Sequence, residues 1–422
     1  MSMPRSPRLL IFGINYAPEE TGIAVNTTGI AEGLAQAGWD VTAITGIPHY
    51  PAWRRGRVPA ADPREPVRVI HRAHYVPRRP STARRAVYEG SWLASCLPEL
   101  TRRREVDLVL GVVPSLSGGV LAALAARRCG VPYVLMFQDL MGRAAEQSRF
   151  KGARSVSRAV SKMELQLARH AARVAVVADG FRPYLIGGGV PPERIGRVRN
   201  PVRMDPPNRE RRKTRESLRW QPDEFIVLHS GNMGFKQALE NVIRVAELAR
   251  REHQIRFVLQ GDGNQRERLE RLSAQRGLTN VSFLPLAPAG EFPNIVAAAD
   301  LLLVNQGRDV RDMSLPAKIT CYFAVGLPVL AAVAADSETG REVSFSEGGI
   351  VVEPEKPEAL LEAIRCLAAD RGRRERLGAA GRRFAVRELR PEQTVRQMVE
   401  HLELAMAGRT ARHRATVEID RP

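Results

Sequence analysis

The sequence has few cysteines, few aromatic residues and no long apolar run. No apolar stretch approaches the roughly twenty residues that a membrane-spanning helix needs, and the first apolar run is too short for the core of a signal peptide. A disulfide framework and a zinc site are both disfavoured, because no CxxC pair occurs among the four cysteines, Cys96, Cys129, Cys321 and Cys366. We therefore expect a protein of the reducing cytoplasm that meets a membrane only at its surface.

Clusters of His, Asp and Glu with metal-ligand spacing are also missing, as is an Asp-x-Asp pair, so we expect no obligatory metal. The chain contains 64 Lys and Arg residues and 46 Asp and Glu residues, which gives a net charge of +18. An excess of this size suits nucleic acid, anionic lipid or phosphorylated substrates. Aromatic residues make up only 5% of the chain and are not interleaved with its basic runs, so we expect no nucleic-acid partner.

Short apolar runs alternate with segments of helical periodicity along the whole chain. Strands that are apolar on both faces and separated by helices predict parallel βαβ units. The alternation restarts after an Arg/Pro-rich interval at 197–220, so the sequence predicts two doubly wound α/β domains. The expected strands are 8–14, 41–45, 106–113, 133–137, 174–178, 225–231, 255–263, 281–284, 300–305, 327–333 and 348–354.

Four parts of the chain follow from this pattern. We expect one Rossmann-like domain at 1–202 and a second at 203–385. A C-terminal helix at 386–406 is expected to pack back on the first domain, and 407–422 to be a disordered tail. The helix is predicted from an apolar face at Val395, Met398, Leu402 and Ala405.

Two glycine loops follow predicted strands of the second domain. Backbone amides of the first loop, Gly231 to Gly234, together with the ammonium of Lys236, could converge on a phosphate. The second loop, Gly261 to Gly263, ends the next strand and is expected at the same sheet edge. The alternative is an ordinary strand-to-helix turn in which the glycines supply positive φ and Lys236 is solvated.

Taken in order, several motifs resemble those of retaining GT-B glycosyltransferases of family four. The resemblance covers about residues 8–405 and is nearest to the branch that builds colanic acid and capsule exopolysaccharides. The motifs are VRNPV (198–202), SGNMGFKQALE (230–240), LQGDGNQRERLE (259–270), SLPAKITCYFAVGLPVLAA (314–332) and GGIVVEPEKPEALLEAI (348–364).

This resemblance implies two facing domains, with the acceptor on the first and a nucleotide diphosphate sugar on the second. It implies transfer with retention to a lipid-linked or other glycan acceptor, without a cofactor, by a peripheral protein at the inner face of the plasma membrane. A soluble natural product remains an alternative acceptor. A nucleotide-sugar epimerase or a non-catalytic nucleotide-sugar-binding protein remains an alternative of another class.

The resemblance also assigns donor-site residues. Because Asn232 stands where relatives carry an arginine, Lys236 becomes the matched cation, and Lys318 is a candidate replacement for the missing charge. The amides of Ser314 and Leu315 could take the β-phosphate or sugar hydroxyls. A solvated helix position is the competing interpretation of Lys318.

The first domain contributes three further candidates. Gly22 would let backbone amides approach the diphosphate or the sugar, or it simply makes a tight turn. Gln138 and Asp139 end an apolar strand, where they could bond sugar hydroxyls, and Asp139 could act as a general base. A helix cap is the equally weighted alternative for Asp139. His49 and His229 are interpreted as packing or loop residues.

Arginines surround an apolar stripe of the first domain at Tyr88, Trp92, Cys96 and Leu100. Such a stripe is usually core, but the arginines at 78–85 and 102–104 would attract anionic headgroups. The sequence therefore predicts an anionic membrane surface as a partner.

Overall fold

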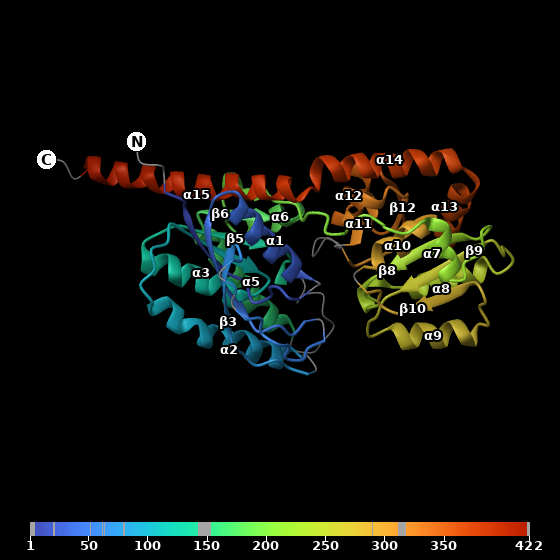
Figure 1. Ribbon diagram of the computed structural model, residues 1–422, viewed down its shortest axis with the longest axis horizontal. Coiled ribbons are helices and arrows are strands. Elements are labelled where there is room, and N and C mark those ends of the chain that lie inside the picture. Colours follow the sequence, from blue (N-terminus) through green and yellow to red (C-terminus); the bar gives the residue numbers. More distant parts are fainter. Residues whose placement is uncertain are drawn as a thin grey trace. The chain divides into compact units, whose positions relative to one another are not determined.

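The computed structural model describes residues 5–19, 22–50, 52–60, 62, 64–78, 81–141, 153–288, 290–310 and 318–419, with side chains left out at 82, 153–157 and 409–419. The chain forms two compact units (Figure 1). Unit 1 comprises Met1–Pro201 and Pro391–Pro422, and unit 2 comprises Val202–Arg390.

Unit 1 is built on a seven-stranded parallel sheet with the order β3-β2-β1-β4-β5-β6-β7. The order reverses beside β1, and in such sheets the crevice at the reversal, beyond the carboxyl ends of the strands, receives the ligand. The strands are β1 (Arg8–Phe12), β2 (Asp40–Gly46), β3 (Val67–Arg72), β4 (Leu108–Val113), β5 (Tyr133–Phe137), β6 (Arg173–Val176) and β7 (Ile195–Arg197).

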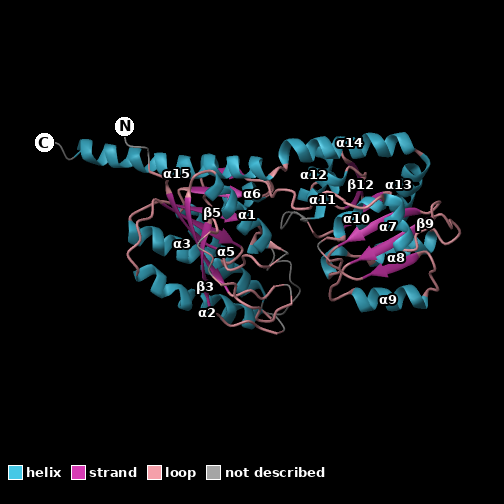
Figure 2. Cartoon of the chain, viewed as in Figure 1, coloured by secondary structure: helices cyan, strands magenta, loops and turns pink. Residues whose placement is uncertain are grey.

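Helices cover both faces of this sheet (Figure 2), because its central strands β4 and β5 are buried along their whole length and need apolar cover on either side. Side-chain caps begin two of these helices: Ser81 caps α2, and Ser115 caps α3. The described helices are α1 (Ile23–Gln36), α2 (Thr82–Thr101), α3 (Leu116–Cys129), α5 (Ala153–His170), α6 (Phe181–Gly187), η1 (Pro192–Arg194) and α15 (Pro391–Ile419).

Unit 2 repeats the design with a six-stranded parallel sheet of order β10-β9-β8-β11-β12-β13. Residues of its central strand β8 alternate between two apolar cores, Phe225 and Val227 in one and Ile226 and Leu228 in the other, as the two-residue period of a strand requires. The strands are β8 (Phe225–Ser230), β9 (Ile255–Gln260), β10 (Val281–Leu284), β11 (Leu301–Asn305), β12 (Val329–Ala332) and β13 (Gly349–Val352).

The described helices of unit 2 follow the strands in alternation. They are α7 (Arg211–Ser217), η2 (Phe235–Gln237), α8 (Glu240–Leu248), α9 (Arg266–Gln275), α10 (Phe292–Ala298), α11 (Lys318–Val325), α12 (Glu338–Ser346), α13 (Pro357–Ala369) and α14 (Arg371–Glu388).

The prediction of two doubly wound parallel sheets is confirmed, and every predicted strand is present within a few residues. Two strands were not predicted from the sequence. The edge strand β3, VRVIHR, alternates charged and apolar residues and is only partly buried, whereas β7 has three residues. Neither gives the continuous apolar run on which the prediction relied.

Helix α15 packs against α1, β5 and β6 within unit 1. Its predicted apolar face is confirmed, since Met398, Leu402 and Ala405 are buried in the core of unit 1 and Val395 packs against it. The helix extends to Ile419, so a helix occupies most of the segment that was expected to be a disordered tail. The sequence after Gly408 includes four Arg and two Ala, which tolerate a helix well.

Contact between α1 and α15 depends on the absence of a side chain at Gly33. A Cβ atom there would lie 2.2 Å from Cγ2 of Val395, far inside normal contact. We expect Gly33→Ala to cost about 1–3 kcal/mol of unfolding free energy by overpacking. In a Val395→Ala background the same change should stabilise by up to about 1 kcal/mol, because alanine is the better helix former. Urea unfolding of the four proteins tests this, and an effect of the same sign in both backgrounds would contradict it.

Candidate functional site

The two glycine loops of unit 2 interlock at the carboxyl edge of its sheet. Gly261 has φ +130°, and a Cβ atom on it would lie 1.9 Å from the carbonyl oxygen of Gly231. At Gly263, φ +153°, a Cβ atom would lie 2.5 Å from the carbonyl oxygen of Met233. The Met233 amide donates to the Asp262 carbonyl at 2.8 Å. Glycine is needed at both positions, because the second loop touches the backbone of the first.

Several amides expected to face an anion are already used by the protein. The Gly231 amide donates to the Gln260 carbonyl at 2.9 Å, and the Gly234 amide donates to Oε1 of Gln237 at 3.1 Å. The Gly263 amide donates to its neighbour Asp262 at 2.7 Å. Counting only acceptors on described residues, the amides of Asn232, Phe235 and Lys236 have none. The free donors of the first loop therefore lie beside its glycines and not on them.

Lys236 is exposed in η2, and residues at the end of β11 hold the backbone around it in place. Its carbonyl accepts the Gly307 amide at 2.9 Å. The side chain of Asn305, which ends β11, donates to the carbonyls of Gln237 at 2.7 Å and Ala238 at 3.1 Å. Asn241 in turn donates to Oδ1 of Asn305 at 3.0 Å. The sequence analysis missed Asn305, although a polar residue that ends an apolar strand is the available signal.

Lys318 begins α11 and reaches the first glycine loop. Its ammonium lies 3.2 Å from Nε2 and 3.5 Å from Nδ1 of His229, and 3.5 Å from where a Cβ atom of Gly231 would stand. Burial lowers the pKa of Lys318 to about 7. No carboxylate among the described residues pairs with it. Lys318 is therefore a partly buried cation beside the glycine loop and not a solvated helix residue.

His229 was assigned to packing, and it is fully buried. Its pKa is held well below the ordinary value by burial first and by the Lys318 charge second, so the ring is neutral where it contacts the lysine. The sequence analysis missed this contact, because His229 and Lys318 are far apart in the chain. Ser314 and Leu315 lie outside the described residues.

In unit 1, Gly22 precedes α1 with φ +68°. A Cβ atom there would lie 3.1 Å from Cε1 of Tyr50, so the glycine makes room for this ring. Gln138 is buried, and its Oε1 accepts from Asn26 at 3.4 Å and from Asn200 at 2.9 Å. The amide oxygen of Gln138 is thus engaged within unit 1, where it joins the end of β5 to α1 and to the turn at 198–202.

Asp139 follows Gln138 and is partly exposed. Its charge raises the pKa of Tyr50, after the larger effect of burial, so the carboxylate lies near that phenol. The residues from 142 to 152, which would decide whether Asp139 caps a helix, lie outside the described residues. Its role as a base or as a cap stays a prediction.

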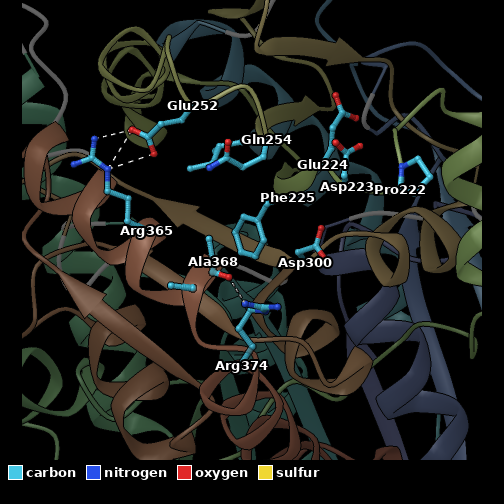
Figure 3. Close-up of a pocket in the computed structure, with 12 residues that line it drawn as sticks. Pro222, Asp223, Glu224, Phe225, Glu252, Gln254, Asp300, Arg365, Ala368 and Arg374 are labelled. Carbon is cyan, nitrogen blue, oxygen red and sulfur yellow. Dashed lines mark hydrogen bonds and ion pairs between the residues drawn. The ribbon is translucent and has the colours of Figure 1, made fainter.

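A cavity of about 470 Å³ lies at the opposite, amino edge of the unit 2 sheet, among the first residues of β8 and β9 (Figure 3). Most of its charged side chains make contacts within the protein. Glu252 accepts from Arg365 at 2.6 Å, Asp300 accepts from Arg215 at 3.1 Å, and the Arg374 guanidinium stacks over Phe225 at 5.2 Å. Two of its carboxylates, Glu252 and Asp300, are thus neutralised by arginines, and we keep the candidate site at the carboxyl edge.

Within the described ranges, no group of three or more His, Cys, Asp and Glu side chains is arranged to hold a metal ion. A search of the same residues finds no helix that is both long and apolar enough to cross a bilayer.

Comparison with known proteins covers both units. The family profile described as "Glycosyl transferases group 1" matches residues 210–384, and that described as "Glycosyl transferase 4-like domain" matches residues 21–201. The chain is 32% identical to WcaI of Escherichia coli (strain K12), a glycosyl transferase named for colanic acid biosynthesis, across 94% of this chain and 99% of that protein.

Two solved structures share the fold. Sucrose-phosphate synthase from Thermosynechococcus elongatus superposes with a TM-score of 0.73 at 19% identity, covering 95% of this chain and 100% of that one. HepE from Anabaena, solved with UDP-glucose, has a TM-score of 0.69 at 16% identity, covering 94% of this chain and 99% of that one.

The lowered pKa of Lys318 makes the stability of unit 2 depend on pH. The unfolded chain binds a proton at this lysine up to pH 10.5, whereas the folded chain loses it near pH 7. Between these values the unfolded state binds more protons, so this group makes the free energy of unfolding rise with pH. The full destabilisation caused by the buried lysine is present at and below pH 7.

We expect Lys318→Met to stabilise the protein most at pH 6 and progressively less toward pH 10. Urea unfolding at pH 6, 8 and 10 measures this, with Lys236→Met as the exposed-lysine control. A pH-independent difference from wild type would show that Lys318 titrates normally.

Proposed function

Since this chain belongs to the group 1 glycosyl transferases of family four and has their GT-B fold, we propose that it transfers the sugar of a UDP-sugar, with retention, to a hydroxyl of a lipid-linked or other glycan acceptor. One observation carries the proposal: Lys318, without a described carboxylate partner, stands beside interlocked glycine loops that also present Lys236. UDP is favoured as the carrier, because the structurally similar HepE was solved with UDP-glucose.

The two lysines fit the chemistry of the leaving group. Breaking the bond between the sugar and the diphosphate places growing negative charge on the diphosphate, and preorganised donors aimed at that charge give the largest catalytic contribution. Lys236, Lys318 and the free amides of Asn232, Phe235 and Lys236 supply such donors from one sheet edge. An anion beside Lys318 favours its charged form, so donor binding is accompanied by proton uptake near neutral pH. With the lysines in this role, turnover is proposed to be independent of divalent metal.

Residues of unit 1 serve the acceptor in this proposal. Asp139, partly exposed at the end of β5, is the candidate to polarise the acceptor hydroxyl. Gln138 affects the acceptor hydroxyl only indirectly. Its side-chain amide contacts Asn26 and Asn200, and these contacts hold the backbone that carries Asp139. Gly22 contributes by admitting the Tyr50 ring beside α1.

Lys236→Ala tests the catalytic assignment. A cation whose attraction strengthens as the bond breaks should affect kcat more than donor binding. By analogy with the removal of one oxyanion donor, we expect about a hundredfold loss in kcat, about 2.7 kcal/mol. The assay is single-turnover release of nucleotide, with the UDP-, GDP- or dTDP-sugar that the wild type uses best. Lys213→Ala, an exposed lysine on α7, is the control. A folded Lys236→Ala protein with wild-type kcat would reduce the loop to a simple turn.

The outer face of α2 suits an anionic membrane. Both acidic side chains of the helix are used inside unit 1: Glu89 accepts from Ser115 at 2.9 Å, and buried Glu99 pairs with Arg72, Arg102 and Arg104. The predicted stripe is core, with Trp92 and Cys96 fully buried. The solvent side instead presents apolar and cationic residues, namely Val87, Leu97, Arg84, Arg102 and Arg103.

This face supports peripheral attachment to the inner face of the plasma membrane. Each arginine near such a surface contributes about 1 kcal/mol of binding free energy. Salt weakens this attraction, because it screens charges that are farther apart than the Debye length of about 8–10 Å. We expect Arg84→Glu combined with Arg103→Glu to abolish sedimentation with phosphatidylglycerol-rich vesicles at 0.15 M salt. The charge-matched control is Arg271→Glu with Arg373→Glu, two exposed arginines of unit 2. Equal sedimentation of the two double variants would exclude α2 as the docking face.

A further inference from the structure

An exposed aromatic side chain is held rigidly at the carboxyl edge of the unit 1 sheet. Tyr50 is 39% exposed, yet its backbone is fixed by a buried carboxylate. Oε1 of Glu19 accepts the amides of His49 at 2.8 Å and Tyr50 at 2.9 Å. Asn15 donates to Oε2 of the same carboxylate at 2.9 Å. Burying a carboxylate is costly unless it is fully bonded, and here its bonds serve the loop after β2.

The Tyr50 ring is confined on its sides as well. The missing Cβ of Gly22 leaves space for one ring edge, with 3.1 Å to Cε1. Trp53 meets the ring edge-to-face at 6.2 Å between centroids. Trp53 itself packs on His49 at 5.5 Å and on Tyr88 at 5.7 Å, and Nε2 of His49 bonds the Tyr88 hydroxyl at 3.0 Å. Partly buried Trp53 and buried His49 and Tyr88 thus form an aromatic and imidazole cluster beside the exposed ring.

Charged groups surround the outer end of the ring. The Arg85 guanidinium stacks over Trp53 at 5.7 Å, which holds this cation beside the aromatic cluster. The charges of Arg85, Glu19 and Asp139 all act on the Tyr50 hydroxyl. The patch therefore combines one exposed aromatic surface with the guanidinium of Arg85, and the Asp139 carboxylate lies near enough for its charge to raise the pKa of the Tyr50 phenol.

A pyranose ring matches this combination, because it presents an apolar C–H face and a rim of hydroxyls that both donate and accept hydrogen bonds. A rigid aromatic surface binds such a face at little entropic cost. A bare phosphate would use Arg85 but would gain nothing from the ring and would be repelled by Asp139.

We propose that Tyr50, flanked by Arg85 and Asp139, seats a pyranose of the acceptor, so that the group receiving the sugar is itself a sugar. This rests on the proposed function, and it narrows the acceptor to a glycan whose reacting residue is a pyranose. Glu19 and Gly22 are positioning residues for the ring.

Fluorescence quenching tests the site without catalysis. Of the four tryptophans, Trp39, Trp92 and Trp220 are at most 6% exposed, so acrylamide quenching reports mainly on Trp53. Methyl glucopyranosides, galactopyranosides and mannopyranosides are the probes, with inorganic phosphate as the competing ligand. We expect at least one pyranoside to protect Trp53 in the wild type and in Tyr50→Phe, which keeps the ring. In Tyr50→Ala, the same protection of Trp53 should require at least a tenfold higher concentration of that pyranoside.

The matched control is Tyr75→Ala, because Tyr75 is also 39% exposed but makes no ring contact with the cluster among the described residues. Protection that is unchanged in Tyr50→Ala, or protection by phosphate and by no pyranoside, would overturn the proposal. In the catalytic assay, the ratio of transfer onto the protecting pyranoside to donor hydrolysis should fall at least tenfold in Tyr50→Ala and stay constant in Tyr75→Ala. A wild type that releases nucleotide from no donor would refute the proposed function, whereas the quenching result would still decide the pyranose site.

Discussion

The close approach of two backbone loops in unit 2 is the constraint on which the candidate donor site depends. The carbonyl oxygen of Gly231 occupies the place where any residue other than glycine at 261 would carry its Cβ atom. This contact fixes the ends of β8 and β9 against each other, and Lys318 can then lie against Gly231 from α11. A side chain at Gly261 would push the first loop away, and the cation, the free amides and Lys236 would no longer share one sheet edge.

Both units use buried polar side chains to position exposed ones. In unit 2, Asn305 bonds the backbone immediately after Lys236, and neutral His229 contacts the Lys318 ammonium. In unit 1, Glu19 fixes Tyr50, and Gln138 fixes the strand end before Asp139. A buried polar group is stable only when it is bonded, so each of these residues holds its partner in one geometry. Rigid positioning of this kind lowers the entropic cost of binding.

The chain separates its electrostatic functions by location. Along α2 both acids are bonded within unit 1, whereas Arg84 is exposed on the helix and Arg102 and Arg103 are exposed just after it, which leaves a cationic face for an extended surface. At the amino edge of the unit 2 sheet, Glu252 pairs with Arg365 and Asp300 pairs with Arg215, while Arg374 stacks over Phe225. The positive charge to which we assign a role therefore lies in two places, the exposed side of α2 and the glycine loops. A large net charge by itself, as read from composition, does not distinguish these roles.

Much of the architecture is determined by local sequence. Apolar runs such as those of β5 and β8 specify buried parallel strands, and the stripe from Val395 to Ala405 specifies the face of α15, because periodicity depends only on neighbours in the chain. The loops with Gly231 and Gly261 were also identifiable, since strand-glycine-helix order is local. The short strand β7 and the half-polar edge strand β3 were not, because their pairing is supplied by the sheet. Only the tertiary structure brought Lys318 to His229, Asn305 to the carbonyls of Gln237 and Ala238, and Glu19 to the amide of Tyr50. These contacts join residues that are 30 to 90 positions apart, and no local pattern encodes which distant side chain will satisfy a given donor or cation.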